Sequence, residues 1–345
     1  MPADQGLSEW VEAYLPERYR SGAALSMTPL NGDAGFRRYF RVDCHPTLLA
    51  VSAPPEHENN AAFVAIDLLL RQQGVHTPVI FAVDYERGYL LLEDFGDQLL
   101  LPLLNEQTVD DLYHRAESVL LKIQRATVAG APVPDYDRQR LLDEMALFPE
   151  WFVSGLLGIE PGEEERALLQ RTFDVLLDSA LSQPAVLVHR DYHSRNLMLL
   201  DDGDIGVIDF QDAVTGPFTY DLVSLLRDCY IRWPARDVSR RALNYFQRAV
   251  AAGIATPVPD EQFLRWFDLM GLQRHIKVLG IFARLFLRDG KAGYLDDLPL
   301  VIRYTLEQLG SYPELNEFKS WFVRRILPAA QEQSWYRLWQ RAGDA

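Results

Sequence analysis

The residues best suited to chemistry lie in the stretch HRDYHSRNLMLLDDGDIGVIDF, at positions 189–210. Asp191 closes a His-Arg-Asp tripeptide, Asn196 follows five positions later, and Asp209 comes after an apolar run. Phosphoryl transfer needs a carboxylate that orients the attacking hydroxyl and oxygen ligands that hold Mg²⁺ on the nucleotide phosphates. The spacing therefore predicts Asp191 as a catalytic base, and Asn196 and Asp209 as ligands of Mg²⁺.

The same stretch matches the protein-kinase pattern H-R-D-x-x-x-x-N followed by a metal-binding aspartate. The residues after Asp209 are Phe-Gln-Asp, so the D-F-G triplet of the protein kinases is absent. His193, inside the loop, is a candidate for contact with the acceptor. Asp212 could lie near the metal or the incoming hydroxyl, or it could cap a turn.

Length and charge narrow the classes of function. A chain of 345 residues is long enough for two lobes. Its net charge of −15 argues against a general binder of nucleic acid or of anionic membranes. Cys44 and Cys229 have no metal-site spacing, the N-terminus has no signal-peptide pattern, and no apolar run could span a membrane. We therefore expect a cytoplasmic protein, and the sequence says nothing about protein partners.

The elements that must position these residues fall into two groups. Alternating apolar residues near the N-terminus predict a mainly antiparallel sheet with one inserted helix, and helical periodicity dominates afterwards. The expected segments are a helix at 7–15, strands within 25–43, 48–53 and 79–96, an inserted helix at 56–73, later helices at 109–126, 141–157, 163–181 and 270–291, and a hairpin at 196–210.

This order of elements indicates an α+β, bilobal, protein-kinase-like fold. A small antiparallel-sheet N-lobe with one helix, residues 1–97, would bind the nucleotide phosphates. A larger, mostly helical C-lobe, residues 98–345, would carry the catalytic loop, the metal ligands and the acceptor site.

Two segments of the N-lobe predict contacts with ATP. Residues 91–95, LLEDF, lie where the lobes should join, so the backbone around Glu93 and Phe95 would meet the adenine edge. A glycine-containing turn upstream would cover the phosphates with backbone N–H groups. This turn consists of Asn31, Gly32, Asp33, Ala34 and Gly35.

The cation that should pair with the nucleotide phosphates is not a lysine of the third strand, since no lysine precedes Lys122. Arg37, Arg38 and Arg41 are the available cluster. Strand alternation sends Arg37 and Arg41 to one face and Arg38 to the other, and the sequence leaves open which face meets the nucleotide. Glu58 could pair with one of these arginines or could only favour a helix N-terminus.

A basic stripe marks the helix expected at 270–291. At 100° per residue, four cations fall within an arc of about 80°. Such a stripe could be a solvated face, or part of it could meet an anionic acceptor. The stripe consists of Arg274, Lys277, Arg284 and Arg288, of which we select Arg274 and Lys277 as candidate acceptor-binding residues.

Over nearly its whole length the chain resembles the aminoglycoside phosphotransferase-like kinases. HRDYHSRNLML and IDFQDAVTGPFTYDLVSLLRD are similar to that family's catalytic and metal-binding segments. NGDAGFRRYFRV, LFPEWFV and MGLQRHIKVLGIFARL are similar to segments of its cell-wall recycling kinases, which phosphorylate N-acetylmuramate and N-acetylglucosamine at the anomeric hydroxyl. The resemblance implies transfer from ATP, dependent on Mg²⁺, that yields a sugar 1-phosphate.

Two other functions stay open at this stage. The acidic net charge also suits a kinase of a cationic small molecule, such as an aminoglycoside, choline or a homoserine-like amine. The missing lysine is compatible with a nucleotide-binding regulator that has no catalytic activity. A basic pocket lined by aromatic side chains would favour the sugar acid, whereas a carboxylate-lined pocket would favour the amine.

Overall fold

The computed structural model describes residues 5–20, 25–30, 36–128 and 130–344. These residues divide into two compact units, which are described separately. The first unit joins Met1–Val133 to Arg195–Ala213, and the second joins Pro134–Ser194 to Val214–Ala345.

The predicted catalytic stretch is shared between the two units. Asp191 belongs to the second unit, whereas Asn196 and Asp209 belong to the first. The expected division into an N-lobe, residues 1–97, and a C-lobe, residues 98–345, stays a prediction.

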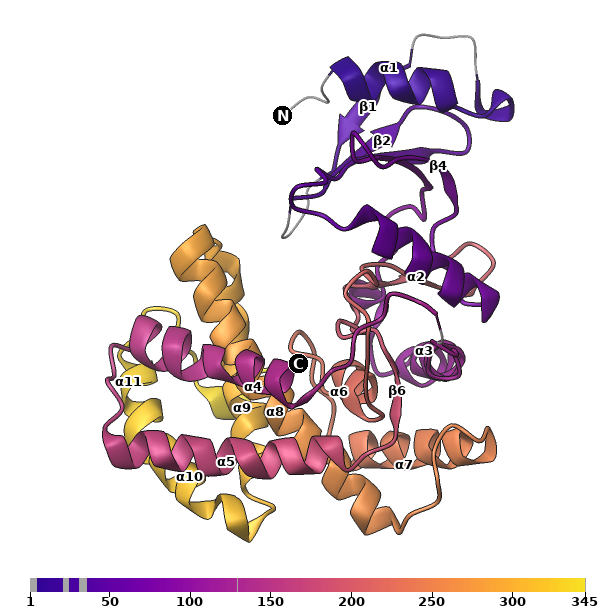
Figure 1. The fold of residues 1–345 in the computed structure, drawn as a ribbon. Helices are drawn as coiled ribbons and strands as arrows, with labels where there is room; N and C mark the ends of the chain where they lie inside the picture. Colours follow the sequence, from indigo (N-terminus) through magenta and orange to yellow (C-terminus); the bar gives the residue numbers. More distant parts are fainter. Residues whose placement is uncertain (1–4, 21–24, 31–35, 129, 345) are drawn as a thin grey trace. The chain divides into compact units, whose positions relative to one another are not determined.

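A five-stranded antiparallel sheet forms the upper part of the first unit in the described residues (Figure 1). The strand order is β1-β2-β3-β5-β4, so β3 is central. Phe40 of β2 lies opposite Ala50 of β3, which in turn lies opposite Leu91 of β5. The strands are β1 (Met27–Pro29), β2 (Arg38–Val42), β3 (Leu48–Ser52), β4 (Ile80–Asp84) and β5 (Tyr89–Glu93).

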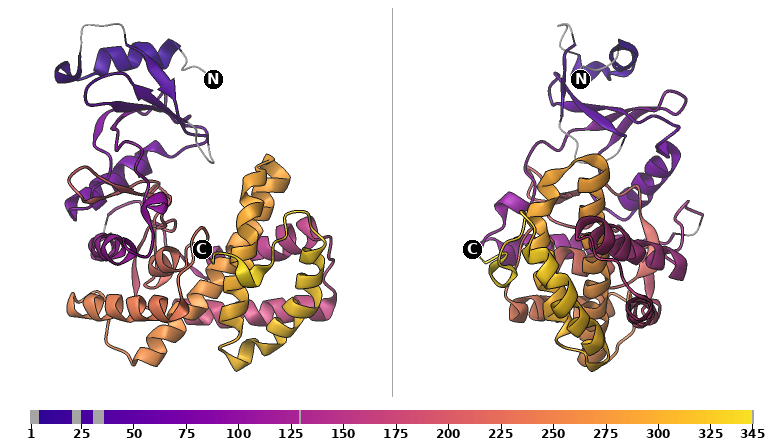
Figure 2. Two further views of the ribbon diagram at one scale, coloured as in Figure 1. Left: turned by 180° about the vertical axis from the view of Figure 1, so that it is seen from behind. Right: turned by 90° about the vertical axis from the view of Figure 1, so that its left-hand side faces the viewer.

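Helix α1 (Gln5–Tyr14) covers one face of this sheet (Figure 2). Its buried Leu7, Trp10 and Val11 share a core with Phe40 and Val42 of β2. This confirms the amphipathic helix expected at 7–15. Since successive residues of a strand point to opposite faces, Tyr39 and Arg41 face away from α1, whereas Arg38 lies on the same face as Phe40.

Helix α2 (Asn60–Gln72) is the inserted helix, but the expected start at residue 56 is wrong. Asn59 caps the helix, because its side chain accepts a hydrogen bond of 3.0 Å from Ala62 N. The preceding residues form a turn in which Pro54 O accepts from Glu58 N at 2.9 Å. Glu58 therefore lies in the turn before the helix.

The first unit also contains helix α3 (Val109–Gln124) and a hairpin of β7 (Leu197–Leu199) with β8 (Ile205–Val207). Arg115 of α3 donates to Gly203 O in the hairpin turn at 2.6 Å. On the β8 side, Val207 N donates to His76 O at 2.8 Å. These contacts attach the expected hairpin to the rest of the first unit.

The second unit consists mainly of helices around α8 (Asp260–Asp289), which extends farther than the helix expected at 270–291. Helices α4, α5, α6 and α9 all pack against α8 (Figures 1 and 2). The other elements are α4 (Arg138–Leu147), α5 (Glu163–Leu181), the paired strands β6 (Ala185–Val188) and β9 (Val214–Pro217), α6 (Tyr220–Leu226), α7 (Ala235–Ala251), α9 (Leu298–Leu309), α10 (Asn316–Trp321) and α11 (Leu327–Gln331).

The segment expected to be helical at 141–157 is helical, but it changes its helix type partway. Helix α4 ends at Leu147, and a π-helical segment follows at Phe148–Leu156. Pro149 has no backbone N–H to donate, so the α-helical hydrogen-bond ladder cannot continue unchanged through it. Short 3₁₀ turns complete the structure at Glu17–Tyr19, Leu101–Leu103, Ala292–Asp297, Pro313–Leu315 and Trp339–Arg341, with a second π-helical turn at Phe322–Ile326.

Gly280 allows α8 to approach the end of α4 very closely. A Cβ atom at position 280 would lie 2.4 Å from Leu147 C and 2.6 Å from Phe148 N. Only a glycine fits at such a distance from another backbone. Within the described ranges, none of the helices is both long and apolar enough to cross a membrane, and Cys44 and Cys229 are free, buried thiols.

Candidate active site

The β7–β8 hairpin brings the two predicted metal ligands together. Asn196 directly precedes β7, and Asp209 follows β8. Ile208 N donates to Asn196 O at 3.1 Å, which closes the open end of the hairpin. As a result, Asn196 Nδ2 lies 3.3 Å from Asp209 Oδ2, although thirteen positions separate the two residues.

Asp209 has a left-handed backbone with φ of 63°. Such a conformation is uncommon for a residue with a side chain, and it is concentrated at functional sites. The next residue, Phe210, is buried and stacks on Phe63 of α2 at 4.9 Å between ring centroids. Gln211 Nε2 donates to Asp209 Oδ1 at 2.8 Å. The buried Phe210 thus anchors the turn while the Asp209 carboxylate stays exposed.

The chemistry of these side chains fits a hard divalent cation. Asn196 offers an amide oxygen, and Asp209 offers two carboxylate oxygens. Oxygen ligands of this kind suit Mg²⁺, which is bound through one or two carboxylates together with substrate phosphates and water.

Two buried aspartates hold the loop that carries Asp191. Asp221 accepts from His189 N at 2.7 Å and from Arg190 N at 3.0 Å. Asp228 accepts from both the backbone N (2.9 Å) and the hydroxyl (2.5 Å) of Ser194. Burial raises the pKa of Asp221 to about 7, against the effect of its two backbone donors. Its position at the start of α6 suggests that Asp221 caps this helix. Its carboxylate instead fixes the backbone of the loop.

The charge of Asp191 is set by the cations around it. Burial alone would raise the pKa of its carboxyl group. Lys277, Arg274, His193 and Arg190 outweigh burial and lower that pKa to about 2. The sequence-predicted residues Asp191, His193, Arg274 and Lys277 are thus brought together within the second unit, and Asp191 is ionised at neutral pH.

Glu144 of α4 joins these cations into one network. It accepts from Lys277 Nζ at 3.0 Å, from Arg190 Nη2 at 2.5 Å, and from the hydroxyl of Tyr136. Lys277 Nζ also donates to Tyr220 Oη at 2.9 Å. Burial would raise the pKa of Glu144, but Lys277 and Arg190 outweigh it and lower that pKa. Glu144 therefore remains a carboxylate and compensates the buried cations.

The basic stripe on α8 has two different ends. Arg274 and Lys277 are 3% and 4% exposed, and Arg274 Nη1 donates to Arg190 O at 3.0 Å. Arg288 is exposed and pairs with its neighbour Asp289 at 2.8 Å. The inner end of the stripe therefore contacts the loop that carries Asp191, whereas a contact of Arg274 or Lys277 with an acceptor stays a prediction.

His193 lies against an aromatic row. Its ring makes an edge contact with Tyr230 at 5.4 Å between centroids. Tyr230 stacks on Phe282 of α8 at 6.3 Å, and Phe282 contacts Tyr294 at 5.0 Å. Through His193, Tyr230 thus contacts the loop that carries Asp191.

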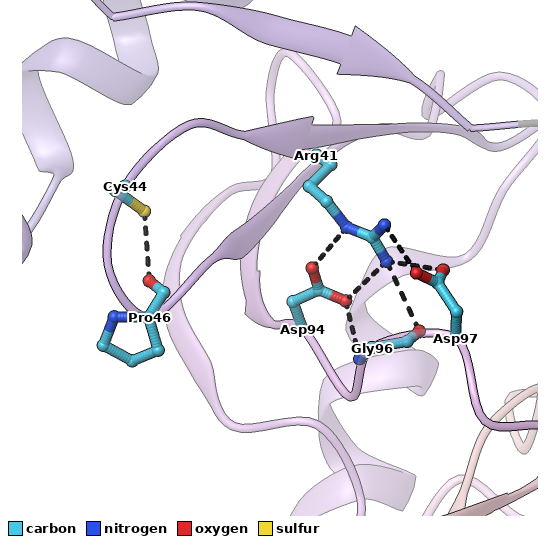
Figure 3. Close-up of polar contacts among 6 residues, drawn as sticks. All are labelled: Arg41, Cys44, Pro46, Asp94, Gly96 and Asp97. Atoms are coloured by element: carbon cyan, nitrogen blue, oxygen red, sulfur yellow. Dashed lines mark hydrogen bonds and ion pairs between the residues drawn. The ribbon is translucent and has the colours of Figure 1, made fainter.

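The three arginines after the predicted phosphate turn have different surroundings. Arg41 is held by Asp94 (2.6 Å) and Asp97 (2.8 Å) and also donates to Gly96 O (Figure 3). Arg38 is exposed on β2. Arg37 pairs with Glu58 at 3.3 Å between Nε and Oε2, which confirms the first of the two roles considered for Glu58.

The other predicted nucleotide contacts lie in the first unit. The side chain of Glu93, at the end of β5, accepts a hydrogen bond of 3.1 Å from Val79 N. The Phe95 ring packs against Gly206 of β8, where a Cβ atom would lie 2.7 Å from it. Asp212 is exposed. Asn31, Gly32, Asp33, Ala34 and Gly35 lie outside the described residues.

The functional analysis of the sequence missed Glu144, Tyr136, Asp221 and Asp228 as parts of this site. Glu144 binds Arg190 across 46 positions, and Asp228 binds Ser194 across 34. No local pattern in the sequence marks contacts over such separations.

Comparisons with known proteins identify the family to which the chain is similar. A model of the phosphotransferase enzyme family matches residues 26–265. The N-acetylmuramate/N-acetylglucosamine kinase of Pseudomonas putida is 46% identical over 319 residues, which cover 91% of this chain and 94% of that protein. The kinase of the same name from Pseudomonas aeruginosa is 43% identical over the same shares of the two chains.

A likeness to solved structures confirms the predicted fold class. The ADP-bound crystal structure of an aminoglycoside phosphotransferase matches with a TM-score of 0.57 at 13% identity. The match covers 89% of this chain and 99% of that chain. At this identity the likeness shows the fold, α+β with an antiparallel sheet followed by a mostly helical part, and not the substrate.

Proposed function

We propose that this chain, which belongs to the phosphotransferase enzyme family, transfers the γ-phosphoryl group of ATP to the anomeric hydroxyl of N-acetylmuramate and N-acetylglucosamine. The observation that carries the proposal is the 46% identity to a kinase named for these two sugars, across nearly the whole of both chains. The product would be a sugar 1-phosphate, formed in the cytoplasm during peptidoglycan recycling.

Asp191 would act on the acceptor hydroxyl. Its carboxylate would accept a hydrogen bond from that hydroxyl, aim it at the γ-phosphorus and take up the proton as the new bond forms. The network of Arg190, Arg274, Lys277 and Glu144 supports this role because it keeps the carboxylate ionised.

Asn196 and Asp209 would hold Mg²⁺ with the nucleotide phosphates. When bound, the ion would neutralise charge that develops on the transferred group. The paired ends of the β7–β8 hairpin support this role because they hold Asn196 and Asp209 beside each other.

The remaining predicted contacts complete the proposal. The backbone near Glu93 and Phe95 would meet adenine, and the turn at 31–35 with Arg37 and Arg38 would meet the phosphates. His193 and Asp212 would lie near the acceptor. Arg274 or Lys277 would meet the lactyl carboxylate that N-acetylmuramate carries and N-acetylglucosamine lacks.

A second candidate is a kinase of a cationic small molecule, favoured by the net charge of −15 and by the fold shared with an aminoglycoside phosphotransferase. The buried cations beside Asp191 disfavour it, since they would repel an ammonium acceptor. A nucleotide-binding regulator without catalysis is a third candidate, and the presence of Asp191, Asn196 and Asp209 disfavours it.

An acceptor screen followed by ³¹P NMR separates these candidates. With MgATP, we expect N-acetylmuramate and N-acetylglucosamine to give a phosphorus signal coupled to the anomeric proton, while choline and aminoglycosides give no product. The Asp191→Asn variant should lose about 10²- to 10⁴-fold in kcat with the fold intact. Product from the amines alone would replace the proposal by the second candidate, and nucleotide binding without any product would replace it by the third.

A further inference from the structure

The first unit contains no lysine between its N-terminus and Lys122, although nucleotide phosphates call for a positively charged partner. Of the arginines after the predicted turn, Arg41 is already bound to acceptors of the protein itself. Its guanidinium binds the carboxylates of Asp94 and Asp97 and the carbonyl oxygen of Gly96 (Figure 3). Arg41 therefore fixes the end of β5 to β2.

Arg37, in contrast, is bound on one side of its guanidinium only. Its side chain is only 7% exposed, and its ion pair with Glu58 uses the Nε edge of the guanidinium. Nη1 and Nη2 are buried as well, and neither has a hydrogen-bond acceptor within the part of the chain that the structure describes. Leaving buried N–H donors of a charged group unsatisfied is costly, so these donors call for a partner such as a bound water, an anion or a ligand.

Two aromatic rings link the surroundings of Arg37 to the turn that carries the predicted metal ligand Asp209. Its Cζ atom lies 4.7 Å from the centroid of the Phe63 ring. Phe63 in turn stacks on Phe210, the residue that follows Asp209. Burial raises the pKa of Tyr39, and the charges of Asp209 and Glu58 raise it further, whereas Arg37 lowers it through its charge and a side-chain contact with the hydroxyl.

We propose that Arg37, oriented by Glu58, is the cation that binds the nucleotide phosphates in place of the absent lysine. A guanidinium presents parallel N–H groups that match two phosphate oxygens, and both Nη atoms of Arg37 are left for this purpose by the Nε-directed pair with Glu58. The inference deepens the proposed function, on which it rests for the nature of the ligand, a nucleoside triphosphate.

Isothermal titration calorimetry with ATP, ADP, AMP and adenosine, in the absence of any acceptor, tests this role. Arg37→Met should weaken ATP binding by at least about tenfold, the loss should shrink as phosphates are removed, and adenosine should bind as tightly as to the wild type. Arg87→Met is the matched control, because Arg87 lies in the same unit with its side chain 65% exposed. It should bind all four ligands as the wild type does.

Two further variants guard against loss of folding. Arg37→Lys keeps the positive charge but loses the parallel N–H groups of the guanidinium. It should bind ATP more tightly than Arg37→Met and more weakly than the wild type. Glu58→Gln keeps Arg37 and removes its partner, and it should weaken ATP more than adenosine.

The inference would be overturned if Arg37→Met bound ATP like the wild type, or if it lost ATP and adenosine equally. It would also be overturned if Arg37→Lys and Glu58→Gln, compared at equal thermal stability, left the preference for ATP over adenosine unchanged. A protein that needs Arg37 for ATP but phosphorylates no amino sugar would refute the proposed acceptor and leave this inference standing.

Discussion

At the level of single residues, Asp191 combines a central position with a very low pKa. Lys277, Arg274, His193 and Arg190 hold that pKa at about 2, which makes the carboxylate a weak base. Phosphoryl transfer tolerates this, because bond breaking to the leaving group runs ahead of proton removal and the main need is orientation. The cations are therefore expected to keep Asp191 ionised and fixed, at the expense of its basicity.

The Lys277→Met variant tests this account through the pH dependence of kcat/KM. In the wild type the low pKa means that Asp191 stays ionised from alkaline pH down to mildly acid pH. Without Lys277, the burial that opposes ionisation is less compensated, so the pKa of Asp191 rises. We expect kcat/KM for the acceptor to gain an acid limb, falling about tenfold per pH unit below the new pKa.

Matched variants identify the source of such a limb. Lys277→Arg retains the charge and should keep the wild-type profile, while Arg288→Met removes an exposed cation from the same helix and should also leave it unchanged. A profile for Lys277→Met that parallels the wild type at every pH would show that Lys277 does not control Asp191.

At the level of elements, the close approach of α8 to the end of α4 supports this network. Helix α8 carries Arg274 and Lys277, and α4 carries Glu144. Gly280 sets the distance between the two helices, because any Cβ atom would overlap the backbone at Leu147.

Gly280→Ala should therefore lower the free energy of unfolding by about 1–3 kcal/mol, the usual cost of forcing extra volume into a packed interior. Urea denaturation measures this change. Gly293→Ala is the control, because a Cβ atom there would meet nothing within 4 Å and the backbone is not left-handed. It should change stability by no more than about 0.5 kcal/mol. Equal stability of the two variants would show that the helices can separate without cost.

At the level of the whole molecule, the sequence was sufficient where the signal was local. Periodicity predicted the sheet and most helices, and short spacing pointed to Asn196 and Asp209 as a pair that the hairpin brings together. The sequence was insufficient where contacts with distant residues decide the role of a side chain. Arg37 and Arg41 look alike in sequence, yet Arg41 is occupied by acids 53 and 56 positions away. Glu144 likewise depends on a contact that only the packing of α4 on α8 creates.

The division into two units makes a final prediction about ligands. The groups proposed for nucleotide and metal, Arg37, Asn196 and Asp209, all belong to the first unit, and those proposed for the acceptor hydroxyl and carboxylate, Asp191 and Lys277, belong to the second. Bound ligands slow amide hydrogen exchange in the segments that they stabilise. We therefore expect MgATP alone to protect the strands around Arg37 and the β7–β8 hairpin. Adenosine should protect the end of β5 without protecting the hairpin. N-acetylmuramate alone should protect the Asp191 loop and α8. Each ligand is added singly, so no transfer occurs during labelling. Protection of α8 and not of the hairpin by MgATP would contradict this assignment, since the phosphates would then lie with the cations of the second unit and not with Arg37.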